Sequence, residues 1–171
     1  MKSFFIKFLC WLARGVVKKY HPRVVAITGS LGKTSAKEAI FTVLREKFRV
    51  RAAVKSYNTE AGVALTIFGL PWPGRHWWNW PKVFFQGLAL YFGRDKNYPE
   101  ILILEMAADR PGDLRKLVQM VTPEVAVVTA VGSAHLEFFG SVEKIAREKL
   151  TVPLNVPESG LVVLNQDDVL V

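Results

Sequence analysis

The sequence predicts an α/β fold in which helices flank a mostly parallel sheet. Short apolar runs, typical of buried strands, occur at residues 24–28, 49–54, 101–106, 125–131 and 161–164. Helical patterns separate them at residues 36–47, 62–69, 114–121 and 141–150. The first of these helices is predicted to turn Ala39, Ile40, Val43 and Leu44 inward, and Ser141 is a good capping residue for the last. Strands that alternate with helices indicate a parallel sheet with right-handed crossovers. A glycine-containing loop, residues 29–35, follows the first strand.

Composition and charge exclude several classes of protein. The chain has 171 residues, of which 50% are hydrophobic, so it can bury a sizeable core and is not a disordered chain. Its single cysteine, Cys10, excludes an internal disulfide and a cysteine-based metal cluster. The net charge is +8, but the basic excess is concentrated in the first 23 residues, which contain no acid: Lys2, Lys7, Arg14, Lys18, Lys19 and Arg23. A dedicated nucleic-acid surface is therefore not indicated.

Two segments interrupt the alternation of strands and helices. Residues 1–22 are predicted to form a basic amphipathic helix, whose longest uncharged run, residues 8–13, is too short to span a bilayer. Residues 71–98 form an aromatic-rich helical insert that holds four of the five tryptophans. Two interpretations stay open for these segments. They either pack on their own domain or form a surface for peripheral membrane contact.

The loop after the first strand has the features of a phosphate-binding P-loop. It consists of Gly29, Ser30, Leu31, Gly32, Lys33, Thr34 and Ser35. Glycines allow successive backbone N–H groups to point into one concavity, and the helix that follows adds the positive end of its dipole. Lys33 would neutralise phosphate oxygens and the Thr34 hydroxyl would ligate Mg²⁺. The sequence therefore predicts a fold of the P-loop type that binds ATP and Mg²⁺.

Polar side chains at the ends of later strands are candidates for the same site. Glu105 ends an apolar strand, and His135 follows another. Because the carboxyl ends of parallel strands line the ligand crevice, a carboxylate there can ligate Mg²⁺, and His135 is a candidate for a metal or phosphate role. Lys149 lies near a helix end, where the residue pattern alone assigns it no role.

The motifs together resemble one known family, the Mur ligases, and specifically their central ATP-binding domain. The matching stretches are ITGSLGKTSAKE, YNTEAGVALT, LEMAADRPGDL, VVTAVGSAHLEFFGSVEKIAREK and VLNQDD, in the family's order, over about residues 22–168. They resemble most the branch that adds D-alanyl-D-alanine to a UDP-muramoyl-tripeptide. The resemblance gives a domain plan of residues 1–22 as the amphipathic helix and residues 23–171 as an incomplete central domain.

The resemblance implies an ATP-dependent amide ligase of peptidoglycan precursor synthesis that acts through an acyl phosphate. It implies that Lys33 is the γ-phosphate lysine, that Thr34, Glu105 and His135 bind metal, and that Lys149 matches the family's carbamylated lysine, which would hold a second Mg²⁺. Lys33, His135 and Lys149 are then the catalytic candidates. Asn58 and Glu60 match a loop near the nucleotide and the substrate. Four departures from the family pattern leave the acceptor and the amino substrate open: Thr59, Ala64, Ala107 and Leu150.

Several expectations follow about partners and place. A UDP-linked muramoyl peptide and an amino acid or dipeptide are the expected substrates of the full-length enzyme, in the cytoplasm or at the inner face of the membrane. These residues alone, as a fragment, are not expected to run the whole reaction. Two alternatives remain: a ligase resembling folylpolyglutamate synthase, and a non-catalytic, membrane-attached nucleotide-binding module.

Overall fold

The computed structural model describes residues 2–53, 59–74 and 76–171. Five strands form one parallel sheet in the order β2-β3-β1-β4-β5. Their bounds are β1 Arg23–Thr28, β2 Val50–Ala52, β3 Ile101–Glu105, β4 Val125–Val128 and β5 Leu161–Leu164. The predicted α/β fold with a parallel sheet is thus confirmed. The strand order puts β3, which carries Glu105, directly beside β1, although more than seventy residues separate them in sequence.

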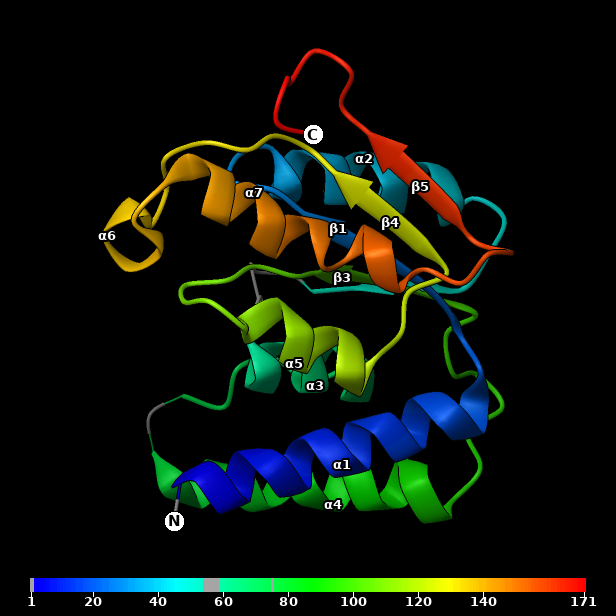
Figure 1. Cartoon of the computed structure of the whole chain (residues 1–171). Coiled ribbons are helices and arrows are strands. Elements are labelled where there is room, and N and C mark those ends of the chain that lie inside the picture. Colours follow the sequence, from blue (N-terminus) through cyan, green and yellow to red (C-terminus); the bar gives the residue numbers. More distant parts are fainter. Residues whose placement is uncertain (1, 54–58, 75) are drawn as a thin grey trace.

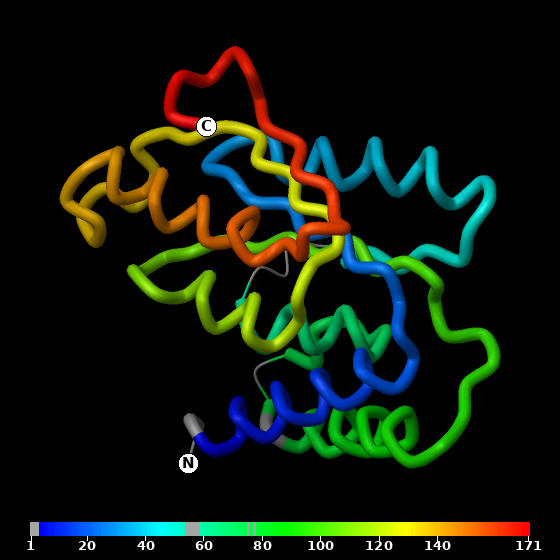
Figure 2. Tube along the Cα trace, turned by 45° about the vertical axis from the view of Figure 1, so that its right-hand side comes forward, coloured from blue at the N-terminus to red at the C-terminus, as the bar shows by residue number. Residues whose placement is uncertain are grey.

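Helices cover both faces of the sheet (Figure 1). Their bounds are α1 Lys2–Tyr20, α2 Lys33–Leu44, α3 Glu60–Phe68, α4 Trp80–Phe92, α5 Asp113–Met120, α6 Leu136–Phe139 and α7 Val142–Leu150, with short 3-10 turns at Trp77–Asn79 and Pro153–Asn155. Helix α2 packs on one face. Helices α3 and α5 pack on the other, and α1 and α4 lie side by side beyond them as an outer layer (Figures 1 and 2).

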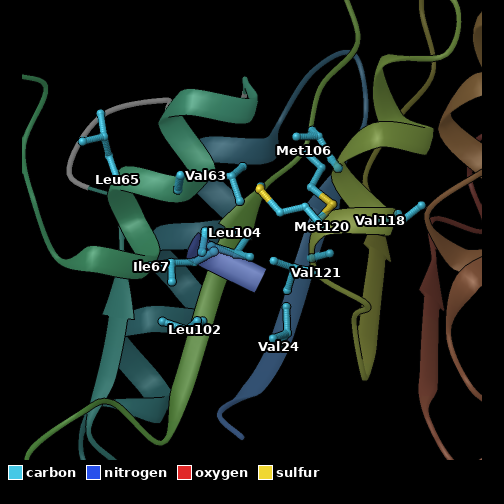
Figure 3. Close-up of a cluster of buried hydrophobic side chains, with 14 of the residues drawn as sticks. Val24, Val63, Leu65, Ile67, Leu102, Leu104, Met106, Val118, Met120 and Val121 are labelled. Atoms are coloured by element: carbon cyan, nitrogen blue, oxygen red, sulfur yellow. The ribbon is translucent and has the colours of Figure 1, made fainter. Parts of the chain in front are cut away.

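The larger core lies between the sheet and the helices α3 and α5. Figure 3 shows Val24 of β1 and the leucines of β3, Leu102 and Leu104, packed beside Val63 and Ile67 of α3 and the methionines and valines around α5. The cluster extends into the outer layer through Leu9, Leu12, Ala13 and Val16 of α1, all fully buried. One face of α1 is therefore part of the domain's own core. Among the described residues, no helix is long and apolar enough to cross a bilayer.

Helix α2 differs from its predicted form in two respects. It begins at Lys33, because Gly32 adopts a left-handed conformation that starts the helix inside the expected loop. Its pattern predicted Ala39 and Val43 on the buried face, but both are exposed. The residues that pack on the sheet are Ala36, Ile40, Phe41 and Leu44, and Lys37 is fully buried among them.

The remaining boundaries moved by a few residues. Strand β4 ends at Val128, earlier than predicted, because the chain turns there to run over the P-loop. The aromatic insert holds one long helix, α4, preceded by a 3-10 turn. Ser141 caps α7 as expected, since its hydroxyl accepts a hydrogen bond from Lys144 N at 3.3 Å.

Candidate functional site

The loop between β1 and α2 is held in shape by the segment that follows β4. Gly29 has a φ of 146°, and a Cβ atom there would lie 2.0 Å from the hydroxyl of Thr129, so only glycine fits. The Thr129 hydroxyl lies 2.5 Å from the carbonyl oxygen of Leu31, and the backbone N–H of Gly132 donates to the Ser30 hydroxyl at 2.9 Å. Residues 129–132, which follow β4, thus hold the loop in this conformation through contacts within the protein.

Lys33 occupies the concavity of this loop. Its ammonium donates hydrogen bonds to the carbonyl oxygens of Gly29, at 2.8 Å, and of Ser30, at 3.2 Å. Partial burial lowers the pKa of Lys33, and the nearby Glu105 carboxylate opposes that shift. Because Lys33 is also the first residue of α2, the positive end of the helix dipole points to the same place. The arrangement suits an anion with several oxygens, such as a polyphosphate.

Glu105 lies at the end of β3, on the face of the sheet that α2 covers, and faces the start of that helix. It pairs in register with Ile27, the residue before the last of β1, and its side chain is fully buried. The Thr34 hydroxyl donates to Glu105 Oε2 at 3.4 Å, and the Lys37 ammonium lies 3.2 Å from Glu105 Oε1. A hydroxyl beside a carboxylate is a donor set that suits Mg²⁺, so these residues fit the metal that the sequence implied.

His135 lies on the same rim of the sheet, but its contact is with Asp109 and not with Glu105. It adopts a left-handed conformation, with a φ of 64°, directly before α6. Its Nε2 atom lies 3.6 Å from Asp109 Oδ1, and both side chains are well exposed. Across the part of the chain that the structure describes, no three His, Cys, Asp or Glu side chains converge tightly enough to hold a metal. A shared site for Glu105 and His135 therefore stays a prediction.

Lys149 is buried, with 5% of its surface exposed. Burial and the nearby Lys33 ammonium lower the pKa of Lys149 to about 8, and the Glu148 carboxylate acts in the opposite direction. Helix α7 is anchored by Glu148, whose two oxygens accept hydrogen bonds from the backbone N–H groups of Gly112 and Leu114, each at 2.9 Å. These bonds attach α7 to the N-terminus of α5 and keep Lys149 on the P-loop side.

The other predicted ligand-binding segment is described only in part. Asn58 lies outside the described residues. Glu60 begins α3, where the Thr59 hydroxyl accepts a hydrogen bond from Gly62 N at 3.3 Å. A pocket next to them is lined by Thr59, Glu60, Ala107, Asp109, Asp113 and Leu117. Glu60 is therefore placed beside a cavity on the rim that carries Asp109 and His135.

Sequence reasoning missed four residues that shape the site: Lys37, Asp109, Thr129 and Glu148. Lys37 could have been noticed, because a lysine four residues after Lys33 falls on the same face of a helix. Thr129 contacts the P-loop and Glu148 contacts α5. Both contacts join segments far apart in sequence, so no local pattern predicts them.

The chain is similar in sequence to proteins of known function. Residues 86–171, half of the chain, match the family described as Mur ligase middle domain. Two curated relatives are named UDP-N-acetylmuramoyl-tripeptide–D-alanyl-D-alanine ligase. The protein from Mycobacterium leprae is 39% identical over 145 residues, which is 85% of this chain, and the one from Bacillus subtilis is 28% identical over 159 residues, which is 93% of it. The chain spans only 23% and 29% of their respective lengths.

Solved structures of the same group are similar in fold. MurF from Thermotoga maritima in complex with ADP is 35% identical with a TM-score of 0.73, and the match covers 95% of this chain and 32% of that one. MurF from Acinetobacter baumannii has the same TM-score at 22% identity, with 94% and 30% covered. FolC from Escherichia coli is more distant in fold, with a TM-score of 0.50 at 16% identity, over 89% and 46% of the two chains. The chain thus belongs to the Mur ligase family and carries its middle domain.

Proposed function

We propose that this chain is the ATP-binding part of a ligase that makes an amide bond in a peptidoglycan precursor. The observation that carries the proposal is the P-loop itself, in which Lys33 fills an anion-binding concavity beside Thr34 and Glu105. The similarity to a MurF structure that contains ADP supports a nucleotide there. The relatives' names support a UDP-linked muramoyl tripeptide as acceptor and D-alanyl-D-alanine as the amine.

The residues present fit a nucleotide with Mg²⁺. Bound ATP supplies a phosphoryl group that turns the substrate carboxylate into an acyl phosphate, and Mg²⁺ neutralises charge on the phosphates. Lys33 would exchange its two carbonyl partners for phosphate oxygens, and the backbone N–H groups at the start of α2 would point at the same oxygens. Thr34 and Glu105 would hold the metal. His135 and Asp109 lie at the same rim, and Asp109 lines the pocket beside Glu60.

Lys149 fits the role of a carbamylated lysine. A pKa of about 8 leaves about 300 times more neutral amine near pH 7 than an ordinary lysine has. The neutral nitrogen attacks the carbon of CO₂ and loses one proton, so a cation becomes a carboxylate-like anion. With ¹³C-labelled bicarbonate, a carbamate signal should appear in the NMR spectrum of the wild-type protein and not in that of Lys149→Arg. The same signal in both proteins would place the carbamate elsewhere.

Titration calorimetry with ADP and Mg²⁺ tests the nucleotide site. Lys33→Ala should abolish the heat of binding, because the ammonium that would pair with the phosphate oxygens inside the loop is then lost. Lys144→Ala, which removes an exposed lysine of α7, is the matched control and should bind as the wild type does. Equal heats from Lys33→Ala and the wild type would refute the site.

A phosphate-release assay separates the three candidate functions. In the full protein that carries this chain, ATP should be hydrolysed only when the UDP-muramoyl tripeptide and D-alanyl-D-alanine are both present. Turnover with a folate and L-glutamate instead would establish the folylpolyglutamate alternative, for which the structural similarity shows the fold alone. Binding of ADP with no turnover on either substrate pair would favour the non-catalytic module.

Peripheral contact with the inner face of the membrane is a further part of this proposal. Helices α1 and α4 place large apolar side chains on the outer surface, with exposed fractions of 78% for Phe4, 71% for Phe85 and 76% for Phe92. On α1, Phe4, Lys7, Trp11 and Lys18 follow one another at helical spacing. Neither helix contains an acidic residue. The surface thus suits an anionic bilayer: burial of one Phe contributes roughly 1.5–3 kcal/mol and each nearby basic residue about 1 kcal/mol.

Co-sedimentation with vesicles tests this surface. The wild type should bind vesicles that contain anionic lipid, less so at high salt. Phe85→Ser should weaken binding about tenfold or more, which corresponds to the lower bound for burying one Phe side chain. Val43→Ser, which removes an exposed apolar side chain on the opposite face of the sheet, is the control and should leave binding unchanged. If the wild type stays in the supernatant at low salt, the surface does not bind membrane.

A further inference from the structure

Lys37 is a buried charged residue that the proposed chemistry does not use. It lies one helical turn after Lys33 on α2 and has no exposed surface. Its ammonium donates to the carbonyl oxygen of Ala53 at 2.7 Å and lies 3.1 Å from Glu38 Oε1 and 3.2 Å from Glu105 Oε1. Three oxygen atoms from three different parts of the chain therefore surround one nitrogen.

The surroundings of Lys37 favour an apolar residue. Helix α2 covers the sheet through Ala36, Ile40, Phe41 and Leu44, which pack against isoleucines and valines of β1 and β3. An ammonium in such a place is costly unless it is paired and hydrogen-bonded. Because Glu38 is largely exposed, it can be satisfied by water, whereas Glu105 cannot. The Lys37 ammonium therefore matters most as the counter-charge of the buried Glu105 carboxylate.

The two oxygens of Glu105 have different partners. Oε1 forms an ion pair with the Lys37 ammonium at 3.2 Å, outside hydrogen-bonding geometry, and Oε2 accepts a hydrogen bond from the Thr34 hydroxyl at the head of α2. An ion pair at one oxygen restrains rotation of the carboxylate about the last side-chain bond, and so restrains the position of the other oxygen. Helix α2 supplies both the residue that holds the carboxylate and the hydroxyl that it faces, and these are three residues apart.

We propose that Lys37 is a positioning residue, which holds Glu105 so that Oε2 and the Thr34 hydroxyl together face a divalent cation bound with the nucleotide. The inference rests on the proposed Mg²⁺-nucleotide function and adds a residue to it. Lys37 itself does not touch the cation. Its effect on the metal passes through Glu105 alone.

The test separates metal binding from nucleotide binding and from folding. The affinity for ADP is measured with EDTA and with Mn²⁺, and the ratio of the two affinities gives the metal-dependent gain. Lys37→Met, which keeps length and removes charge, should lower that gain about tenfold, as expected for one displaced charge-assisted contact. It should leave the affinity in EDTA within about twofold. Glu38→Gln, which also loses an ion pair with Lys37, is the control and should keep the whole gain.

A double-variant comparison excludes a purely structural role. If Lys37 acts through Glu105, then Glu105→Gln and the double variant Glu105→Gln with Lys37→Met should show the same reduced gain. The double variant also removes both buried charges, so it stays measurable if Lys37→Met alone does not fold. A further loss in the double variant would overturn the proposal, as would an unchanged or larger gain in Lys37→Met.

A crystal structure of the wild type with Mn²⁺ and ADP provides an independent measurement. The anomalous peak should lie on the Oε2 side of Glu105, with the Lys37 ammonium still against Oε1. A peak on Oε1, with Lys37 displaced, would overturn the positioning role. If the ADP affinity of the wild type does not respond to metal at all, the proposed function and this inference fail together. A normal metal-dependent gain that survives Lys37→Met refutes the inference alone.

Discussion

Replacement of Glu148 by alanine tests how helix α7, and with it Lys149, is held in place. Both carboxylate oxygens accept backbone hydrogen bonds from the first turn of α5, from Gly112 and Leu114 at 2.9 Å each. No side chain caps α5 from its own N-cap residue, Gly112, so Glu148 takes that role from another helix. The variant leaves two backbone donors without this partner.

The size of the effect follows from these contacts. A hydrogen bond to a charged group contributes about 1.5–3 kcal/mol, and the site is half-buried, so the lower value applies to each bond. The free energy of unfolding should therefore fall by about 3 kcal/mol. For a chain of this length the melting temperature should fall by roughly 6–12 °C. Glu148→Gln, which keeps one carbonyl oxygen as acceptor, should lose about half as much.

Thermal unfolding followed by circular dichroism measures the effect. Arg147→Ala, an exposed neighbour on the same helix, is the control and should change stability by no more than about 0.5 kcal/mol. If Glu148→Ala melts at the same temperature as Arg147→Ala, the two hydrogen bonds do not hold α7 to α5, and the argument about the position of Lys149 fails with them.

Three further predictions concern single positions. Gly29→Ala should abolish ADP binding in calorimetry, because its Cβ would overlap the Thr129 hydroxyl at 2.0 Å; retained binding would show that the loop does not need this conformation. The pKa of Lys149 is lower in the folded chain than in the unfolded one, so its charge costs stability below about pH 8 and this cost fades as the pH rises towards 10.5. Lys149→Met should thus be more stable than the wild type at pH 7, by up to about 3 kcal/mol, when urea unfolding is measured in CO₂-free buffer. The difference in stability should be smaller at pH 9.5, and an equal difference at both pH values would contradict the lowered pKa of Lys149. Burial raises the pKa of Cys10 to about 11, so iodoacetamide at pH 8 should label the native thiol far more slowly than the unfolded one, and equal rates would contradict this.

The sequence determined the elements of this fold because their signals are local. A run such as residues 24–28 is apolar throughout, which is what a strand buried on both faces requires, and it became β1. The glycines at positions 29 and 32 indicated the P-loop in the sequence, because the loop has positive φ angles at both positions and such angles favour glycine. The periodicity of the first twenty residues predicted helix α1, although it did not show which face of the helix is buried.

The tertiary structure decided which of these elements meet. No local pattern places β3 directly beside β1, yet that pairing brings Glu105 to Thr34 and Lys37. The same holds for His135, which faces Asp109, and for Glu148, which caps a helix that begins 35 residues before it. Helix periodicity placed Val43 inward and did not foresee the buried Lys37, because the face that α2 presents depends on the sheet beneath it. Residue types and their spacing thus determined the loop and its chemistry, whereas the partners of Glu105, His135 and Glu148 were set by long-range packing, which no local pattern encodes.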